Sequence, residues 1–181
     1  MRNGLLIVPI LFLLVGCTTY YNYPPQPGDL AVPNPEDGTA VDVQASAVSA
    51  AVVDRPLGAR ANLALPPGTG ALSRAKVLAA AGDALYADQH PDAPTIEVRQ
   101  VRIRGRLAEV DIVRPASVGG PLQLVTVYLN WEPIAGWQSS RLRYWRVPVE
   151  EALRKSAGEV EAATPQESAD DPSVPEPEPT P

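Results

Sequence analysis

The chain has 181 residues, with 15 Lys and Arg against 21 Asp and Glu, one Cys and one His, which is the size of a single ordinary domain. Seven of the acidic groups lie from Glu159 onward, in a stretch that contains no basic residue. The preceding part is close to neutral, and this argues against a nucleic-acid partner bound through a basic surface. One cysteine also excludes a disulfide framework or a thiolate zinc site within one chain.

Residues 1–17 have the pattern of a secretory signal peptide. Arg2 supplies a positive charge, residues 5–15 form a short apolar run, and a small residue precedes Cys17. A positive start, a short apolar stretch and a small residue before the cleavage point are the features of a leader that is removed. A membrane-spanning helix needs about 20 apolar residues. The pattern therefore favours a cleaved leader, residues 1–16, over an uncleaved membrane helix.

The segment Leu14-Val15-Gly16-Cys17 resembles the lipobox of bacterial lipoproteins. The resemblance implies that a diacylglyceryl group is attached to the thiol of Cys17 and that cleavage follows Gly16. The only cysteine of the chain stands where this chemistry needs a thiol. Two or more acyl chains hold a protein stably on a bilayer, so the resemblance implies a lipid-anchored protein of the bacterial cell envelope. Thr18 in place of Asp favours the outer membrane, facing the periplasm, by the enterobacterial sorting pattern.

Composition divides the rest of the chain into three parts. Residues 17–38 are rich in Pro and predict a lipidated cysteine followed by a spacer that forms neither helix nor sheet. At about 3.1 Å per residue this spacer would hold the domain up to roughly 65 Å from the bilayer. Residues 157–181 are acidic and contain six Pro, which predicts a disordered tail. Residues 39–156 are long enough for one α+β domain.

Apart from two β-hairpins, three segments of this domain have helical features and one has the features of a short strand. Residues 41–53 contain Asp42 near their start, a residue type that caps helices, and their alanines favour a helix while their valines do not. Residues 61–65 predict a short strand, ended by prolines. Residues 71–87 carry apolar side chains at spacings of three and four and are the clearest helix. Residues 149–156 are a candidate for a short final helix.

Beyond residue 95 the apolar period changes to two, which predicts a β-hairpin. A slip in this alternation predicts a β-bulge near residues 99–100. A two-residue type II′ turn at Gly105-Arg106 places Val101 opposite Val110. One face of the hairpin is then apolar and the other carries ion pairs.

Residues 122–147 predict a second hairpin. A five-residue loop would bury two arginines among the valines of the first strand, which is costly. We therefore predict a four-residue loop, residues 133–136, which places Leu142 and Tyr144 on the apolar face, because a slip of one residue moves every side chain to the other face. The opposite face then carries the candidate binding residues Tyr128, Trp137, Arg141, Arg143 and Trp145.

Interleaved aromatic and arginine side chains can bind a protein partner, stack on sugars, or pair with carboxylates and phosphates. The alternative is that these aromatic side chains are core residues packed beneath residues 41–53, with the arginines along the edge. The sequence leaves both interpretations open. A protein or a cell-wall polymer would be the partner on the first interpretation.

Other chemical signals are weak. His90 lies between two aspartates, but one His with loosely spaced carboxylates is explained better by a solvated loop than by a metal site. Glu109 and Asp111 face Arg102 across the first hairpin, which predicts a solvent-facing ion-paired surface rather than an acid/base pair. No serine lies in a nucleophile elbow. We therefore expect no enzyme activity, no cofactor and no metal.

The strand ending Tyr128-Leu129-Asn130-Trp131, followed by Gly136-Trp137 and alternating residues up to Trp145, resembles the last hairpin of cystatin-like or nuclear-transport-factor-like α+β rolls. The resemblance implies a curved antiparallel sheet wrapped around a helix, in proteins that serve as binding or assembly modules as often as enzymes. We predict an α+β fold with a four- or five-stranded antiparallel sheet packed on one principal helix and flanked by disordered Pro-rich segments. The function expected is non-catalytic partner binding in the envelope, with a peptidoglycan- or glycan-binding module as the alternative.

Replacing Cys17 by Ala removes the only thiol that could accept acyl chains. In bacteria grown with a labelled fatty acid, we expect the natural chain to carry label and the Cys17→Ala variant to carry none. The measurement is label per immunoprecipitated protein. Equal labelling of the two proteins would show that Cys17 is not the lipidated residue.

Overall fold

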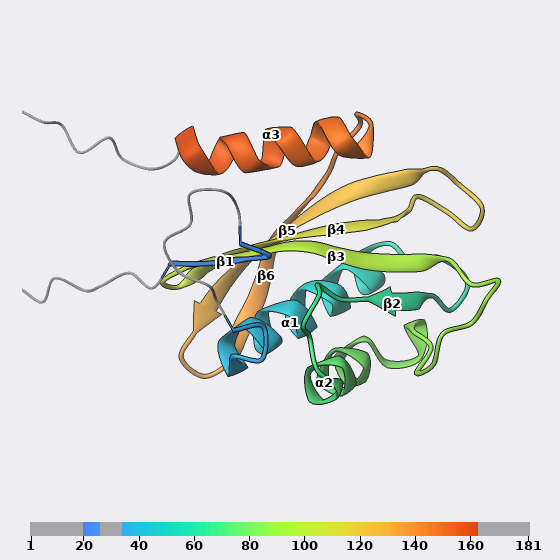
Figure 1. The fold of residues 1–181 in the computed structure, drawn as a ribbon, viewed down its shortest axis with the longest axis horizontal. Helices are drawn as coiled ribbons and strands as arrows, with labels where there is room; N and C mark the ends of the chain where they lie inside the picture. Colours follow the sequence, from blue (N-terminus) through green and yellow to red (C-terminus); the bar gives the residue numbers. More distant parts are fainter. Residues whose placement is uncertain (1–19, 26–33, 163–181) are drawn as a thin grey trace, which may run out of the picture.

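The computed structural model describes residues 20–25 and 34–162, so the lipobox and the end of the acidic tail lie outside the described residues. One sheet has the strand order β1-β3-β4-β5-β6, and a short strand, β2, also pairs with β3. Helices α1 and α2 lie on one side of this sheet and α3 lies on the other (Figure 1). All pairs are antiparallel except β2 with β3. The predicted α+β fold class is confirmed.

Part of the expected spacer is a strand. β1 (Tyr20–Tyr23) pairs antiparallel with the second half of β3 (Thr95–Arg104). β2 (Asn62–Ala64) pairs parallel with the first half, as the strand predicted at residues 61–65. The prediction that residues 17–38 form no sheet is wrong for β1, because its tyrosines favour strands and pairing covers an edge of β3 that would otherwise be open.

The first hairpin has the predicted register. In β3 and β4 (Leu107–Pro115), Val101 lies opposite Val110, and the register shifts between Val98 and Gln100, which is the predicted bulge. Gly105 has a φ of +58°, whereas no residue other than glycine has a positive φ among the described residues. A type II′ turn needs a positive φ only at its first central residue, so this turn fits type II′ and not type I′.

The predicted register of the second hairpin is correct away from the turn and wrong next to it. In β5 (Leu122–Glu132) and β6 (Gly136–Tyr144), Leu142 lies opposite Val127, as predicted. The loop, however, has three residues rather than four, because Gly136 pairs with Glu132. A bulge at Ser140 takes up the difference. Residues of β6 before this bulge are therefore shifted by one position from the prediction.

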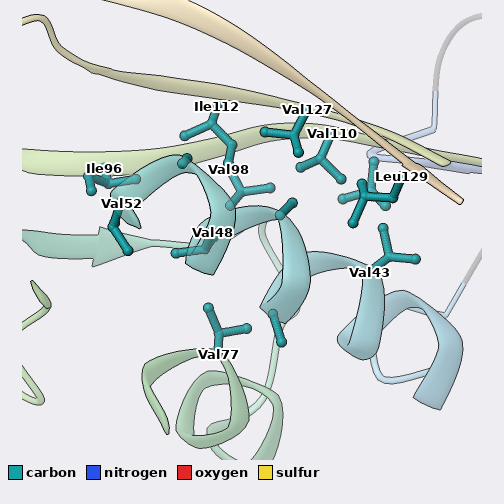
Figure 2. Packing of buried hydrophobic residues seen from close by; sticks show 14 of the residues in the cluster. Val43, Val48, Val52, Val77, Ile96, Val98, Val110, Ile112, Val127 and Leu129 are labelled. Atoms are coloured by element: carbon teal, nitrogen blue, oxygen red, sulfur yellow. The ribbon is translucent and has the colours of Figure 1, made fainter. Parts of the chain in front are cut away.

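The helix that packs against the sheet is α1 (Gly38–Asp54), not the segment with the clearest helical pattern. Val43, Val48 and Val52 of α1 are buried and face the valines and isoleucines of the sheet (Figure 2). α2 (Ala71–Ala81), followed by a short 3-10 helix, η1 (Gly82–Ala84), packs against the other side of α1 through Val77. Because α1 is covered on two sides, it lacks the single apolar stripe of a surface helix.

Both ends of α1 are fixed by side chains. The N-cap is Asp37, whose carboxylate accepts from the backbone N–H of Thr39 at 2.9 Å, and not Asp42 as the sequence suggested. At the other end the buried guanidinium of Arg114 donates to the carbonyls of Ala51 and Arg55. These bonds satisfy carbonyls that the end of a helix leaves without partners.

The last element, α3 (Val149–Ala162), continues past the helix predicted at residues 149–156 into the start of the expected tail. It lies across the face of the sheet that α1 does not cover (Figure 1). Val113, Leu124, Trp145 and Ala152 form a second, smaller cluster of buried side chains between α3 and the sheet. The domain thus has two cores, one on each face of the sheet.

Two substitutions in the second hairpin test which face of the sheet is buried. Val127 is fully buried, so we expect Val127→Asp to lower the free energy of unfolding by about 4 kcal/mol or more, as burial of an unpaired charge does. Arg141 is exposed, so Arg141→Asp is expected to change it by about 1 kcal/mol or less. Urea unfolding followed by circular dichroism measures both. A larger loss for Arg141→Asp would invert the assignment of the faces.

Candidate functional site

The five predicted binding residues do not share a face. Tyr128, Arg141, Arg143 and Trp145 lie on the α3 face of the sheet, but Trp137 pairs with Trp131 and packs in the main core with α1. The placement of Trp137 with the other four is therefore wrong, because the three-residue loop and the bulge at Ser140 shift it to the opposite face. Trp137 is 7% exposed and Trp145 is 6% exposed.

The aromatic faces on the α3 side are already covered by arginines. The guanidinium of Arg141 lies 4.1 Å from the ring centroid of Tyr128, and that of Arg143 lies 3.8 Å from the ring of Trp145. Such cation–π contacts occupy the ring surface on which a sugar would stack. The alternative of core packing is right for Trp137, which lies beneath α1, whereas Trp145 lies beneath α3.

The predicted solvent-facing ion pairs are only partly exposed: Arg102 and Asp111 are buried under α3, whereas Glu109, which also pairs with Arg102, is partly exposed. The carboxylate of Asp111 accepts from Arg102 Nη1 at 2.9 Å, from Thr126 Oγ1 at 2.6 Å and from Ser156 Oγ of α3 at 2.7 Å. Arg102 Nη2 also donates to Ser156 Oγ at 2.9 Å. The indole N–H of Trp145 donates to Thr126 Oγ1 at 3.0 Å.

This network has a structural role. Burial opposes the positive charge of Arg102, but the carboxylates of Asp111 and Glu109 outweigh that effect and raise its pKa. Three donors hold the Asp111 carboxylate within the protein. A buried charge pair is stable only when its remaining hydrogen bonds are made, and Ser156 supplies one of them from α3. The network therefore fixes where α3 lies.

His90 lies in an exposed loop. Its ring stacks on Tyr86, with 4.9 Å between centroids and 16° between planes, and its backbone N–H donates to the side chain of Asn62 at 2.8 Å. Within residues 20–25 and 34–162, no three His, Cys, Asp or Glu side chains lie close enough together to hold a metal ion. The solvated-loop interpretation of His90 fits this placement.

An open groove of about 880 Å³ lies between α1 and the first half of β6. Its α1 wall carries small side chains at spacings of three and four along the helix, namely Ala45, Ser46, Ser49 and Ala50. Its other wall is formed by Trp137, Gln138 and Ser139. This volume lies within the range of about 300–1,000 Å³ found for ligand sites in proteins.

Two contacts between charged or aromatic side chains line the groove. Lys76 of α2 forms an ion pair with Asp42 of α1. The guanidinium of Arg106 lies 4.8 Å from the ring centroid of Trp131. The sequence held one signal for this site, a stripe of small and polar residues that interrupts the valines of α1. That stripe is informative only once α1 is known to lie beside β6.

The groove adjoins an open edge of the sheet. β6 is the last strand in the sheet order, and its outer edge has no partner strand among the described residues. Gln138, Ser139 and Ser140 are exposed along it. The outward backbone N–H and C=O groups of an edge strand are able to pair with another extended chain.

Known proteins give no further guidance. No protein-family model, curated protein or solved structure matches this chain. The resemblance to cystatin-like or nuclear-transport-factor-like rolls stays a prediction. Within the described part of the chain, no helix is both long enough and apolar enough to cross a membrane.

Removing one member of the buried network is expected to loosen α3. Asp111→Asn leaves Arg102 short of a negative partner and should lower the free energy of unfolding by about 3 kcal/mol. Ser156→Ala should lower it by about 1 kcal/mol and speed hydrogen exchange in α3 more than in β4. Urea unfolding and exchange mass spectrometry measure these effects, with exposed Ser140→Ala as the control. Unchanged exchange in α3 for both network variants would show that the network does not hold the helix.

Proposed function

We propose that this chain is a lipid-anchored protein of the bacterial cell envelope whose domain binds an extended segment of a partner protein between α1 and β6. The observation that carries the proposal is that the groove and the unpaired edge of β6 lie side by side. The groove supplies pockets for side chains, and the edge of β6 supplies backbone hydrogen bonds. Together these are the two requirements for recognising a peptide by strand addition.

The small residues on the α1 wall support an extended occupant. Ala45, Ser46 and Ser49 leave room for a backbone to approach the helix. The two serine hydroxyl groups can donate to or accept from polar groups of the bound chain, and the amide oxygen of Gln138, whose Nε2 donates to the carbonyl of Ala135, can accept from them. Val53, which is largely exposed and lines the same groove, offers an apolar contact for one side chain of the partner.

The bulge at Ser140 limits the length of pairing. A bulge bends its strand and interrupts the ladder, so we expect the partner to pair with residues 136–139, the part of β6 that lines the groove. Beyond the bulge, Arg141 lies over Tyr128 on the α3 face. A bound segment of about four residues with polar and small apolar side chains fits this length.

The proposal also includes the lipid anchor at Cys17 and the location at the outer membrane. The lipobox resemblance at Cys17 supports attachment to the membrane, and Thr18 supports the outer membrane. A glycan module based on Trp137 and Trp145 is less well supported, because both side chains are buried. A catalytic role has no support from the residues around the groove, where Lys76 and Asp42 are paired with each other.

The groove can be tested with a phage-displayed library of linear ten-residue peptides selected against the full chain without its leader. We expect the selected peptides to bind the natural protein and to bind a Ser49→Trp variant at least about tenfold more weakly, because the indole fills the groove. Leu72→Ala, at an exposed site outside the groove, is the matched control and should bind normally.

Hydrogen exchange tests whether the peptide binds by strand addition. Strand addition should slow hydrogen exchange of the backbone amides in residues 136–139 when a selected peptide is bound. If no selected peptide binds the natural protein more tightly than the Ser49→Trp variant, the proposal that the groove binds the partner is wrong. Binding without protection of residues 136–139 would contradict strand addition.

A further inference from the structure

Three large apolar side chains are exposed at one end of the sheet. Leu107 is 60% exposed, Trp131 is 38% exposed and Ile134 is fully exposed. Ile134 lies in the β5–β6 turn, Leu107 begins β4 and Trp131 lies near the end of β5. The β3–β4 and β5–β6 turns lie at the same end of the strands (Figure 1). Leu107 lies opposite Asn130 and Trp131 opposite Trp137, so the two side chains flank this end of the sheet from its two faces. Exposed apolar groups that gather at one end of a domain mark a surface that meets another apolar phase.

The two turns form one platform. The backbone N–H of Trp131 donates to the carbonyl of Arg106 at 2.8 Å, and the Arg106 guanidinium covers the Trp131 ring. Leu107 lies opposite Arg104 across the first turn. Residues 104–107 and 131–136 carry two arginines and one carboxylate, Glu132, so the charge around the apolar groups is net positive.

The same end of the sheet is where β1 begins. Tyr20 lies opposite Arg104, and Figure 1 shows the start of β1 beside the β3–β4 turn. Cys17 precedes Tyr20 by three residues, which span at most about 11 Å when fully extended. An acyl group on Cys17 would therefore hold this end of the domain at the bilayer, rather than at the end of a long spacer.

We infer that Leu107, Trp131 and Ile134 insert into the interfacial layer of the lipid bilayer beside the acylated Cys17. The inference rests on the proposed lipid anchor. Tryptophan favours the membrane interface, aliphatic side chains gain from burial among acyl chains, and arginine pairs with lipid phosphates. A bilayer is the occupant favoured over a second protein, because the tether gives it a high effective concentration at this surface.

This orientation deepens the function proposed for the groove. Arg106 and Trp131 line the groove and are also part of the membrane-facing platform. The groove then opens close to the bilayer, and its peptide partner is expected to present its segment at the membrane surface. The β4–β5 loop, with the exposed side chain of Val118, lies at the far end of the strands and points away from the membrane.

The test uses the full chain with a fluorophore at one end of the sheet or at the other. Ile134→Cys and Val118→Cys variants are produced in bacteria, labelled with an environment-sensitive dye, and reconstituted in vesicles of phosphatidylethanolamine and phosphatidylglycerol with spin-labelled acyl chains. We expect strong quenching at position 134 and little at position 118, which is a matched exposed apolar site. Equal quenching at the two positions in vesicle-bound protein would overturn the inference.

The failure of the anchor can be told apart from the failure of the platform. If Cys17 is not acylated, each variant has two reactive thiols and its mass contains no fatty acid. That result would show that the proposed anchor is wrong. In that case Cys17→Ala is added so that the dye labels only position 134 or position 118. The same comparison on vesicle-bound protein then decides the platform, because stronger quenching at position 134 than at position 118 upholds it and equal quenching overturns it. Ser49→Trp, which blocks the groove, should leave the quenching at position 134 unchanged.

Discussion

The burial of α1 between the sheet and α2 is the contact on which the rest of the domain depends. Val43, Val48 and Val52 fill the space beneath the sheet, and the alanines between them let α2 pack closely on the other side. Both ends of the helix are then held, by Asp37 at its start and Arg114 at its end. One flank of α1 remains uncovered, and that flank forms a wall of the groove beside β6.

The second face of the sheet is stabilised in a different way. Its core is small, and a buried set of polar groups around Asp111 joins strands β3, β4 and β5 to Ser156 of α3. Apolar burial is non-directional, whereas hydrogen bonds to a buried carboxylate need defined partners. The apolar face thus supplies most of the core, and the polar network determines where α3 lies.

One bulge and one short strand decide what the domain exposes. The bulge at Ser140 carries Trp137 into the core and leaves the first half of β6 beside the groove. The pairing of β1 with β3 brings the chain near Cys17 to the end of the sheet where Leu107, Trp131 and Ile134 are exposed. Partner recognition and membrane contact are therefore proposed for neighbouring surfaces.

The sequence by itself determined the α+β class, the first hairpin with its bulge and turn, and the pairing of Val127 with Leu142, because these follow from local alternation and turn chemistry. It did not determine that α1 is the central helix, since a helix covered on two sides has no single apolar stripe. Contacts distant in sequence decided the burial of Trp137 and Trp145, the pairing of β1 and the position of α3. A local pattern defines which faces are apolar, but only the assembled layers decide which of them are covered.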